Sequence, residues 1–316
     1  MLTRRDLLAG GGVAFLTACG RSGEMVIGVV PKATSHLFFL SVHAGVEKAA
    51  HDFHVEALWN GPQNETDYAR QIEIVDSMIT QQVAALAISA TDEDALVAPL
   101  ERAIRAGIPV TVFDSSVKIK DYVSFIATDN YAAGSTAAQT LAALLGGKGE
   151  VGMVMQKPGG TSTVLRERAF DDTMGKEFPN IRIVARQYGM ADAARSRAAA
   201  EDILTAHPDL AGIFASSEAA SIGSIQAIRN RNLSGRVKLV TFDFSKLHVE
   251  ALEDGTANAM LVQDPFHIGY EAVKSLSEKL RGRTPAKRLE IPARVIVKAD
   301  LEKPDVRALL TTPAAP

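Results

Sequence analysis

Short apolar runs alternate with longer segments of helical periodicity along the first part of the chain. Residues 25–30 read MVIGVV, and a run without polar positions is typical of a strand buried on both faces. The pattern predicts strands at 25–30, 55–59, 85–89, 109–113 and 123–127, and helices at 39–53, 67–81 and 91–105, the last beginning at the acidic stretch 91–94. This alternation favours a parallel sheet with helices on both faces.

The same alternation restarts after residue 130. The second set has predicted helices at 131–145, 164–178, 192–206, 219–230 and 268–280, and predicted strands at 151–155, 182–187, 212–215, 238–242, 258–262 and 294–297. A length of 316 residues also fits about two domains. We therefore predict an α/β fold of two doubly wound parallel-sheet lobes.

Charge and cysteine content narrow the possible partners. The chain has 34 basic and 37 acidic residues, a formal net charge of −3, so no electrostatic feature favours nucleic acid or an anionic membrane face. The single cysteine excludes a disulfide framework and a cysteine-rich metal site. His51 and His54 have a metal-like spacing but no acidic or cysteine partner. We expect no metal, no cofactor, no nucleic-acid partner and a monomeric chain.

The first 19 residues have the features of an export signal. Arg4 and Arg5 form a basic region, and 7–16 is an apolar stretch of about ten residues, whereas a membrane-spanning helix needs about 20. The stretch 3–8 resembles the twin-arginine export motif. The sequence therefore predicts export out of the cytoplasm, to the periplasm.

Residues 16–19, LTAC, resemble the lipobox of bacterial lipoproteins, in which the cysteine is lipidated and becomes the first residue. The alternative is an ordinary signal peptide with a chance cysteine. Two acyl chains suit stable anchoring, because one binds only marginally. We predict lipidation of Cys19 and anchoring to a membrane, with 20–24 as a short tether.

Polar residues follow many of the predicted strands, and in doubly wound sheets ligands bind outside the carboxyl ends of the strands. These residues are Lys32, Asn60, Ser89, Asp114, Ser115, Gln156, Lys157, Ser216, Ser217, Asp243, Gln263 and Asp264. The carboxylates of Asp114 and Asp243 are candidate acceptors for ligand hydroxyl groups. The alternative for both is a helix N-cap, a role that aspartate often has in strand–loop–helix turns.

Seven stretches, in order, resemble the periplasmic sugar-binding proteins of ABC importers, of the ribose-binding type, which are similar to the effector domains of LacI-type repressors. The stretches are 27–30 with 38–39, 108–114, 126–130, 160–162 with 166–168, 204–209, 242–243, and Gln263. The similarity covers about residues 25–300. It implies two lobes joined by a three-stranded hinge, with a sugar between them.

The resemblance also implies domain boundaries. The three crossings between lobes would lie near 128–129, near Gln263 and near 292–294. Lobe 1 would then comprise 25–128 and 264–292, lobe 2 would comprise 129–263 and 293–311, and 312–316 would be a tail.

Candidate binding residues follow from the resemblance position by position. Phe38 and Phe39 match the aromatic pair that covers the apolar faces of a sugar ring. Polar ligands of sugar hydroxyl groups are matched by Asp114, Arg168, Asp243 and Gln263, while His36, Ser115 and Ser217 complete the candidate set. Because Arg166 and Arg168 are two positions apart, a helix presents only one of them to the cleft.

Several positions depart from the ribose binders. Ser115 stands where they carry arginine, Ser217 replaces an asparagine, and Ala191 occupies a place usually held by an aromatic residue. The loop 31–37 is about two residues longer and brings in Lys32. These departures favour a sugar other than ribose, a polyol or a related polar metabolite.

The resulting hypothesis is a solute-binding lipoprotein that captures a sugar or polyol and delivers it to the membrane permease of an ABC importer. A second hypothesis, presentation of the ligand to a chemoreceptor or a sensor kinase, involves the same cleft. An exported sugar-acting enzyme is a third, but no GxSxG, HExxH or paired-carboxylate motif supports it. A LacI-type repressor is excluded, because an export signal stands where its DNA-binding helices would be.

Overall fold

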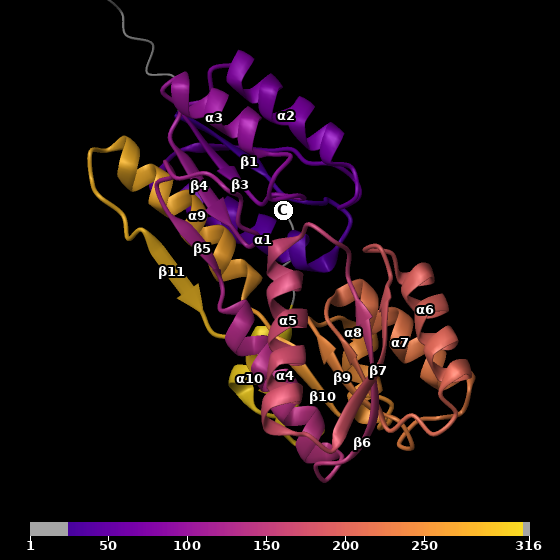
Figure 1. The fold of residues 1–316 in the computed structure, drawn as a ribbon. Coiled ribbons are helices and arrows are strands. Elements are labelled where there is room, and N and C mark those ends of the chain that lie inside the picture. The colour runs from indigo at the N-terminus through magenta and orange to yellow at the C-terminus, as the bar shows by residue number, and fades with distance from the viewer. Residues whose placement is uncertain (1–24, 312–316) are drawn as a thin grey trace, which may run out of the picture.

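The computed structural model describes residues 25–311, which form two lobes, each built around a six-stranded sheet (Figure 1). Helices cover both faces of each sheet, so the predicted α/β fold class is confirmed. The export signal with Cys19, the segment 20–24 and the tail 312–316 lie outside the described residues, and their predictions stay predictions. Within 25–311, no helix combines the length and apolar composition that crossing a bilayer requires.

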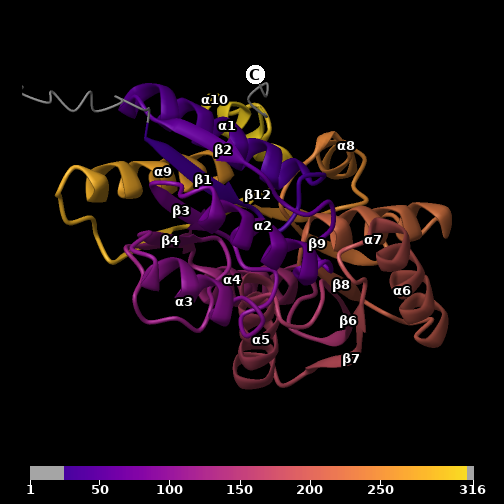
Figure 2. The ribbon, with the colours of Figure 1, turned by 90° about the horizontal axis from the view of Figure 1, so that it is seen from above.

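Lobe 1 has the strand order β11-β5-β4-β3-β1-β2, and every neighbouring pair is parallel. Its strands are β1 (Val26–Val30), β2 (Glu56–Trp59), β3 (Ala85–Ile88), β4 (Val110–Phe113), β5 (Phe125–Thr128) and β11 (Arg288–Ile291). One face packs against α1 (Leu37–Phe53) and α9 (Pro265–Leu280), and the other against α2 (Tyr68–Thr80) and α3 (Val97–Arg105). Figure 2 shows the sheet between these two helical layers.

Lobe 2 has the strand order β12-β10-β9-β8-β6-β7, which is parallel except for the pairing of β12 with β10. Its strands are β6 (Gly149–Met155), β7 (Ile181–Tyr188), β8 (Gly212–Ala215), β9 (Lys238–Phe242), β10 (Ala259–Val262) and β12 (Arg294–Ile296). Its helices are α4 (Asn130–Leu144) and α5 (Thr161–Glu177) on one face, and α6 (Ala193–Ala206), α7 (Glu218–Asn230), α8 (Lys246–Glu253) and α10 (Pro304–Leu310) on the other.

Helices α1 and α9 cross in close contact at two glycines. A Cβ on Gly45 would lie 2.0 Å from the carbonyl oxygen of Phe266, and a Cβ on Gly269 would lie 2.1 Å from that of Val42. A side chain at either glycine would therefore force the helices apart. Because α9 begins just after β10, this contact fixes the start of α1 relative to the point where the chain enters lobe 1.

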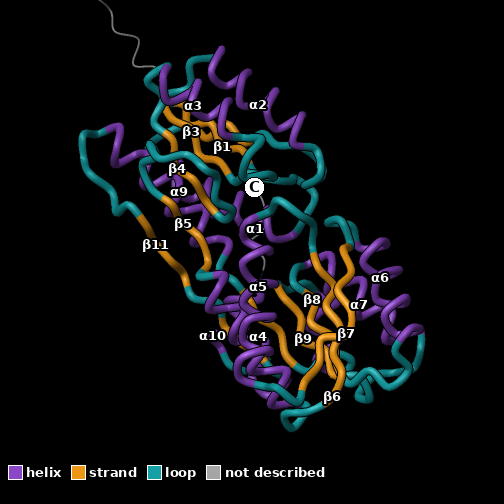
Figure 3. The backbone as a smooth tube through the Cα atoms, in the orientation of Figure 1, coloured by secondary structure: helices purple, strands orange, loops and turns teal. Residues whose placement is uncertain are grey.

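The chain crosses from one lobe to the other three times (Figure 3). It leaves lobe 1 after β5, returns after β10, and passes into lobe 2 again between β11 and β12. The first two crossings are tied together, because the Thr128 hydroxyl donates a hydrogen bond to Gln263 Oε1 at 2.7 Å.

Some elements differ from the sequence predictions. The helix predicted at 91–105 begins only at Val97, because the Asp92 carboxylate accepts hydrogen bonds from the backbone N–H groups of Asp94 and Ala95 and holds this stretch in turns. The strand predicted at 294–297 is the antiparallel edge strand β12. Strand β11 and helices α8 and α10 were not predicted; β11 reads RLEI, whose alternating charges conceal a strand from a search for apolar runs.

Candidate ligand-binding cleft

The candidate site is a cleft between the lobes, at the carboxyl ends of strands from both sheets. Its lining residues are Lys32, His36, Phe38, Phe39, Glu65, Asp114, Gln156, Ser162, Thr163, Arg166, Ser217, Glu218, Asp243 and Gln263. The side chains leave about 30 Å³ of free space, room for no more than a few water molecules. A sugar can therefore enter only after the lobes part or the side chains rearrange.

Direct hydrogen bonds join the lobes around this cleft. The backbone N–H of Ser116 in lobe 1 donates to the Thr161 hydroxyl in lobe 2 at 2.7 Å. The Lys157 ammonium in lobe 2 donates to the carbonyl of Thr91 in lobe 1, also at 2.7 Å. The structure therefore describes a closed arrangement of the two lobes.

Two adjacent aromatic rings at the start of α1 line the cleft. The rings of Phe38 and Phe39 are 5.0 Å apart and nearly perpendicular, with an interplanar angle of 89°. Phe39 is buried among the residues that pack between α1 and the sheet, and Phe38 packs against the same group. Both residues line the cleft, and such aromatic faces suit the C–H faces of a sugar ring.

The two strand-end aspartates, one in each lobe, share an unusual backbone conformation. Asp114 follows β4 and Asp243 follows β9, with φ values of +55° and +68°, in the left-handed region that is costly for residues other than glycine. Neither caps the element that follows it: Ser245 is the N-cap residue of α8. Both carboxylates face the cleft instead.

Lys32 carries a buried cation on the lobe 1 side of the cleft. Its side chain is about 5% exposed, and its ammonium lies 3.0 Å from Asp114 Oδ2 and 3.7 Å from Glu65 Oε2. It also donates to the hydroxyls of Ser115 and Ser162, at 3.3 and 3.2 Å. Burial alone would lower the pKa of Lys32, but the two carboxylates raise it above its ordinary value, so the amine is charged.

Glu65 is held ionised by two cations. His36 Nδ1 lies 3.3 Å from Glu65 Oε1, and Lys32 lies on the other carboxylate oxygen. Burial would raise the pKa of the Glu65 carboxyl, but Lys32 and His36 hold it well below its usual range. In turn, although burial lowers the pKa of His36, the bond to Glu65 raises it above its ordinary value.

The arginine in the cleft is Arg166, and the assignment of Arg168 is wrong. The Arg168 side chain is 71% exposed on the outer face of α5, where it lies 3.6 Å from Asp172. Arg166 is 2% exposed, and its guanidinium donates to Asn130 Oδ1 at 2.7 Å and to the carbonyl of Ser216 at 3.2 Å. Positions two apart point to different sides of a helix, which is why only one of the two reaches the cleft.

Close packing of two helices places Arg166. A Cβ on Gly134 of α4 would lie 2.2 Å from the carbonyl oxygen of Arg166 on α5, so glycine allows the helices to approach. The guanidinium then lies 3.8 Å from the centre of the Phe242 ring. Both of its side-chain hydrogen bonds end on neutral groups. Burial lowers the pKa of Arg166, and the negative charges of Asp243 and Asp114 partly offset this. Several of its five N–H donors remain free for a ligand.

The remaining predicted residues lie in or directly behind the cleft. Gln263 Nε2 donates to Asp243 Oδ1 at 2.6 Å, while the Ser217 hydroxyl bonds to Gln156 Oε1 and also accepts from the backbone N–H of Ala220 at the start of α7. Ser115 is fully buried and meets the Ser162 hydroxyl at 3.0 Å, so it supports Lys32 without lining the cleft itself.

A buried carboxyl lies just behind the lobe 2 wall. Glu167 Oε1 accepts hydrogen bonds from the backbone N–H of Gln156 at 2.9 Å and from the Ser216 hydroxyl at 2.7 Å. Burial raises the pKa of Glu167 to about 7. Glu167 therefore holds in place the chain segment that carries Gln156.

Sequence reasoning missed Glu65 and Glu218 as residues of the cleft. Glu65 lies in the irregular loop between β2 and α2, where no periodic pattern distinguishes it from its neighbours. The only sequence feature that drew attention to this loop was Asn60, at the end of the preceding strand. Glu218 comes directly after the strand-end pair Ser216–Ser217, and an acid in the first turn of a helix is so common that it suggests no further role.

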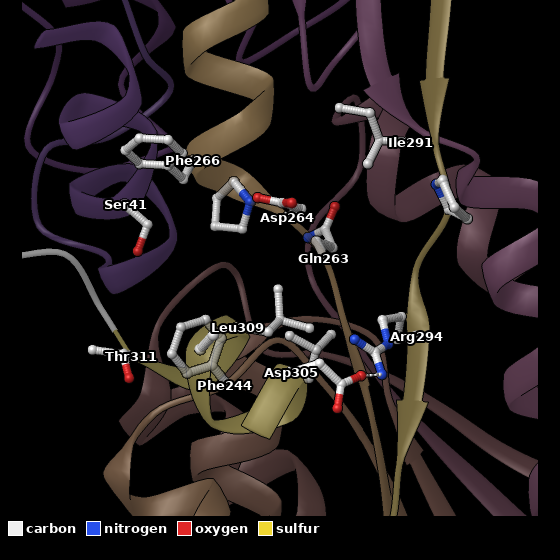
Figure 4. Close-up of a pocket in the computed structure, with 14 residues that line it drawn as sticks. Ser41, Phe244, Gln263, Asp264, Phe266, Ile291, Arg294, Asp305, Leu309 and Thr311 are labelled. Carbon is white, nitrogen blue, oxygen red and sulfur yellow. Dashed lines mark hydrogen bonds and ion pairs between the residues drawn. The ribbon is translucent and has the colours of Figure 1, made fainter. Parts of the chain in front are cut away.

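A larger cavity of about 560 Å³ lies on the other side of Gln263, between the lobes (Figure 4). Apolar side chains such as Phe244, Phe266 and Leu309 form most of its wall, and the Arg294–Asp305 ion pair lies at its edge. Converging charged and hydrogen-bonding groups, the usual mark of a specific polar site, occur in the cleft instead. Within the described part of the chain, no three His, Cys, Asp or Glu side chains are grouped as metal ligands.

Comparison with known proteins gives a consistent result. Residues 27–284 match the family described as "Periplasmic binding protein domain". The chain is 30% identical over 267 residues to a D-ribose/D-allose-binding protein of Pseudomonas aeruginosa (82% of this chain, 83% of the relative) and 28% identical over 277 residues to a ribose import binding protein of Bacillus subtilis (87% and 88%).

Solved structures agree with these relatives. A carbohydrate transporter solute binding protein from Agrobacterium radiobacter, in complex with D-arabinose, superposes with a TM-score of 0.89 at 31% identity, covering 92% of this chain and 100% of that one. An ABC transporter solute binding protein from Agrobacterium vitis, bound with α-D-tagatopyranose, gives a TM-score of 0.88 at 29% identity over 92% and 100%. These relatives and neighbours are named as binding proteins, not enzymes.

Proposed function

Because the chain belongs to the periplasmic binding proteins, of the ribose-binding type, we propose that it is an exported lipoprotein that captures a monosaccharide or polyol and delivers it to the permease of an ABC importer. The observation that carries the proposal is the convergence of complementary groups from both lobes on one cleft. Lobe 1 supplies Phe38 and Asp114, and lobe 2 supplies Arg166 and Asp243.

This set of groups fits a neutral, polyhydroxylated ring. Carboxylates accept from hydroxyl groups, the Arg166 fork donates to them, and charge-assisted hydrogen bonds each contribute about 1.5–3 kcal/mol. Phenylalanine faces cover the C–H groups that lie between the hydroxyls. Lys32 provides a cation beside Ser115, on the side of the cleft where the ribose binders carry an arginine.

Ligand binding is proposed to close the lobes about the three crossings, and the closed form is what the permease would recognise. The small free space in the closed cleft supports this, because an open form is needed for a sugar to enter. Cys19 is proposed to hold the protein at the membrane, next to the permease. Cys19→Ser should release the protein from the membrane fraction; a parent protein that is already soluble, with an N-terminus other than Cys19, would contradict the anchor.

The test is a thermal-shift screen of pentoses, aldohexoses, ketohexoses and polyols. A sugar at 100 times its Kd stabilises the folded state by about 2.7 kcal/mol, which raises Tm by several degrees. Asp114→Asn and Asp243→Asn each replace an acceptor by a donor, so affinity should fall about ten- to hundredfold in both. Full affinity in either variant would remove that aspartate from the site, and a screen without any stabilising compound would overturn the proposal.

A further inference from the structure

The N-terminus of α1 in lobe 1 faces the N-terminus of α7 in lobe 2. The first N–H groups of a helix have no partner inside the helix and carry partial positive charge, so two facing N-termini need an acceptor between them. The N-cap residue of α1, His36, makes no side-chain bond to these groups. The acceptor is instead the carboxylate of Glu218, the first residue of α7. Its Oε1 accepts from Leu37 N–H at 3.3 Å, and its Oε2 accepts from Phe38 N–H at 3.2 Å.

The contact is shielded from water. Glu218 is 9% exposed, and its own backbone N–H donates to Asp243 Oδ2 at 2.9 Å. Burial raises the pKa of Glu218 and the negative charge of Asp243 raises it further, while His36 lowers it. Either carboxyl form keeps an oxygen that accepts from α1, although only the ionised form can serve both N–H groups as an acceptor through both oxygens.

We infer that Glu218 is an interlobe positioning residue: its carboxyl group caps helix α1 from the opposite lobe and fixes Phe38 at the cleft when the lobes are closed. The inference rests on the proposed function only in assuming that the lobes open and close. Opening would separate Glu218 from the N–H groups of Leu37 and Phe38 and return them to water. Closing would restore the cap and the ring position together.

The size of the effect follows from ordinary helix capping. Loss of a capping side chain to alanine changes an equilibrium by about three- to thirtyfold. Glu218→Ala should therefore expose the first N–H groups of α1 in the closed protein. Glu218→Gln keeps one acceptor oxygen and replaces the other by a donor, so it should restore the cap for only one of the two N–H groups.

The experiment closes the lobes without a sugar. The full chain first receives Cys19→Ser, so that it has no native thiol. Ser115→Cys and Ser162→Cys then introduce two thiols where two hydroxyls from opposite lobes lie 3.0 Å apart, and oxidation joins the lobes. Hydrogen exchange of the Leu37 and Phe38 amides is then followed by NMR. We expect protection in the oxidised protein, loss of protection on reduction, and about three- to thirtyfold faster exchange in oxidised Glu218→Ala. In oxidised Glu218→Gln, one of the two amides should again exchange slowly.

Asp192→Ala is the matched control, because Asp192 caps α6 of the same lobe through Arg195 N–H, away from lobe 1. It should speed exchange in α6 but leave Leu37 and Phe38 unchanged. Equal exchange of these two amides in oxidised Glu218→Ala and its parent would overturn the inference, as would equal protection before and after reduction. No sugar is used in this experiment, so it tests the role of Glu218 even if the sugar screen finds no stabilising compound.

Discussion

Buried charged side chains have different partners in the two walls of the cleft: ion pairs in lobe 1, and mainly neutral hydrogen-bonding groups around Arg166 and Glu167 in lobe 2. In lobe 1, Asp114 and Glu65 raise the pKa of Lys32, while Lys32 and His36 lower the pKa of Glu65. In lobe 2, burial lowers the pKa of Arg166 and raises that of Glu167 to about 7, and each makes its short bonds to neutral partners.

The difference separates structural from binding roles. A buried ion that lacks a counter-ion is costly, whereas a paired one is stabilised by its partner. The Lys32–Glu65 ion pair therefore holds the loops of lobe 1 together, while Arg166 keeps N–H donors available to a ligand. Rigid placement of Arg166 by Asn130, Ser216 and the Phe242 ring means that little freedom is lost when a ligand binds.

The largest expected effect is on the ion pairs of lobe 1. Lys32→Met leaves the buried Asp114 carboxylate without its cation and Glu65 with His36 alone, and breaking a buried pair in this way costs about 3–5 kcal/mol. The free energy of unfolding in urea should fall by that amount. Lys118→Met, which removes an exposed lysine paired with Glu93 and Asp94, is the matched control and should leave it nearly unchanged. Equal losses in the two variants would show that the lobe 1 charges are not a structural cluster.

The next effect is a pH dependence that originates in lobe 2. The pKa of Glu167 is raised from 4.5 to about 7, so its contribution to stability is present below pH 4.5 and is lost as pH rises through 7. The loss amounts to about 3 kcal/mol. Glu167→Gln cannot titrate but keeps an oxygen for both of its hydrogen bonds, which end on one atom, Oε1. Urea unfolding at pH 4.5 and pH 8 should show this loss in the parent only; parallel curves would contradict the assignment.

The third effect is on affinity and distinguishes the two arginines of α5. Arg166→Met removes the free donors of the cleft, so affinity for the most stabilising sugar of the screen should fall at least about tenfold per lost bond. Arg168→Ala changes an exposed side chain on the outer face and should leave both affinity and stability within about 0.5 kcal/mol. Calorimetric titration measures both variants. The comparison of the walls fails if Arg168→Ala weakens binding as much as Arg166→Met.

The fold was predictable because its signal is local and repeated. Apolar runs marked the inner strands, and the carboxyl ends of those strands drew attention to Asp114, Asp243 and Gln263, which line the cleft. The choice between Arg166 and Arg168 was not predictable, because it depends on the rotation of α5 about its axis, which the contact at Gly134 sets.

Two kinds of information were absent from the sequence pattern. Glu65 reaches the cleft from a loop without periodicity, and its role depends on Lys32, more than 30 positions away, through a contact across the folded lobe. The partner of Glu218 lies in the other lobe, so no local motif could reveal it. Long-range ion pairs and contacts between lobes are properties of the assembled structure.

The central claim is that one ligand is held by both lobes, which close around it. Small-angle X-ray scattering of the protein with and without the most stabilising sugar of the screen tests it directly. The account predicts that the radius of gyration falls when the sugar is added and that the scattering curve then matches the closed arrangement described above. Identical curves at a sugar concentration that calorimetry shows to be saturating would contradict closure.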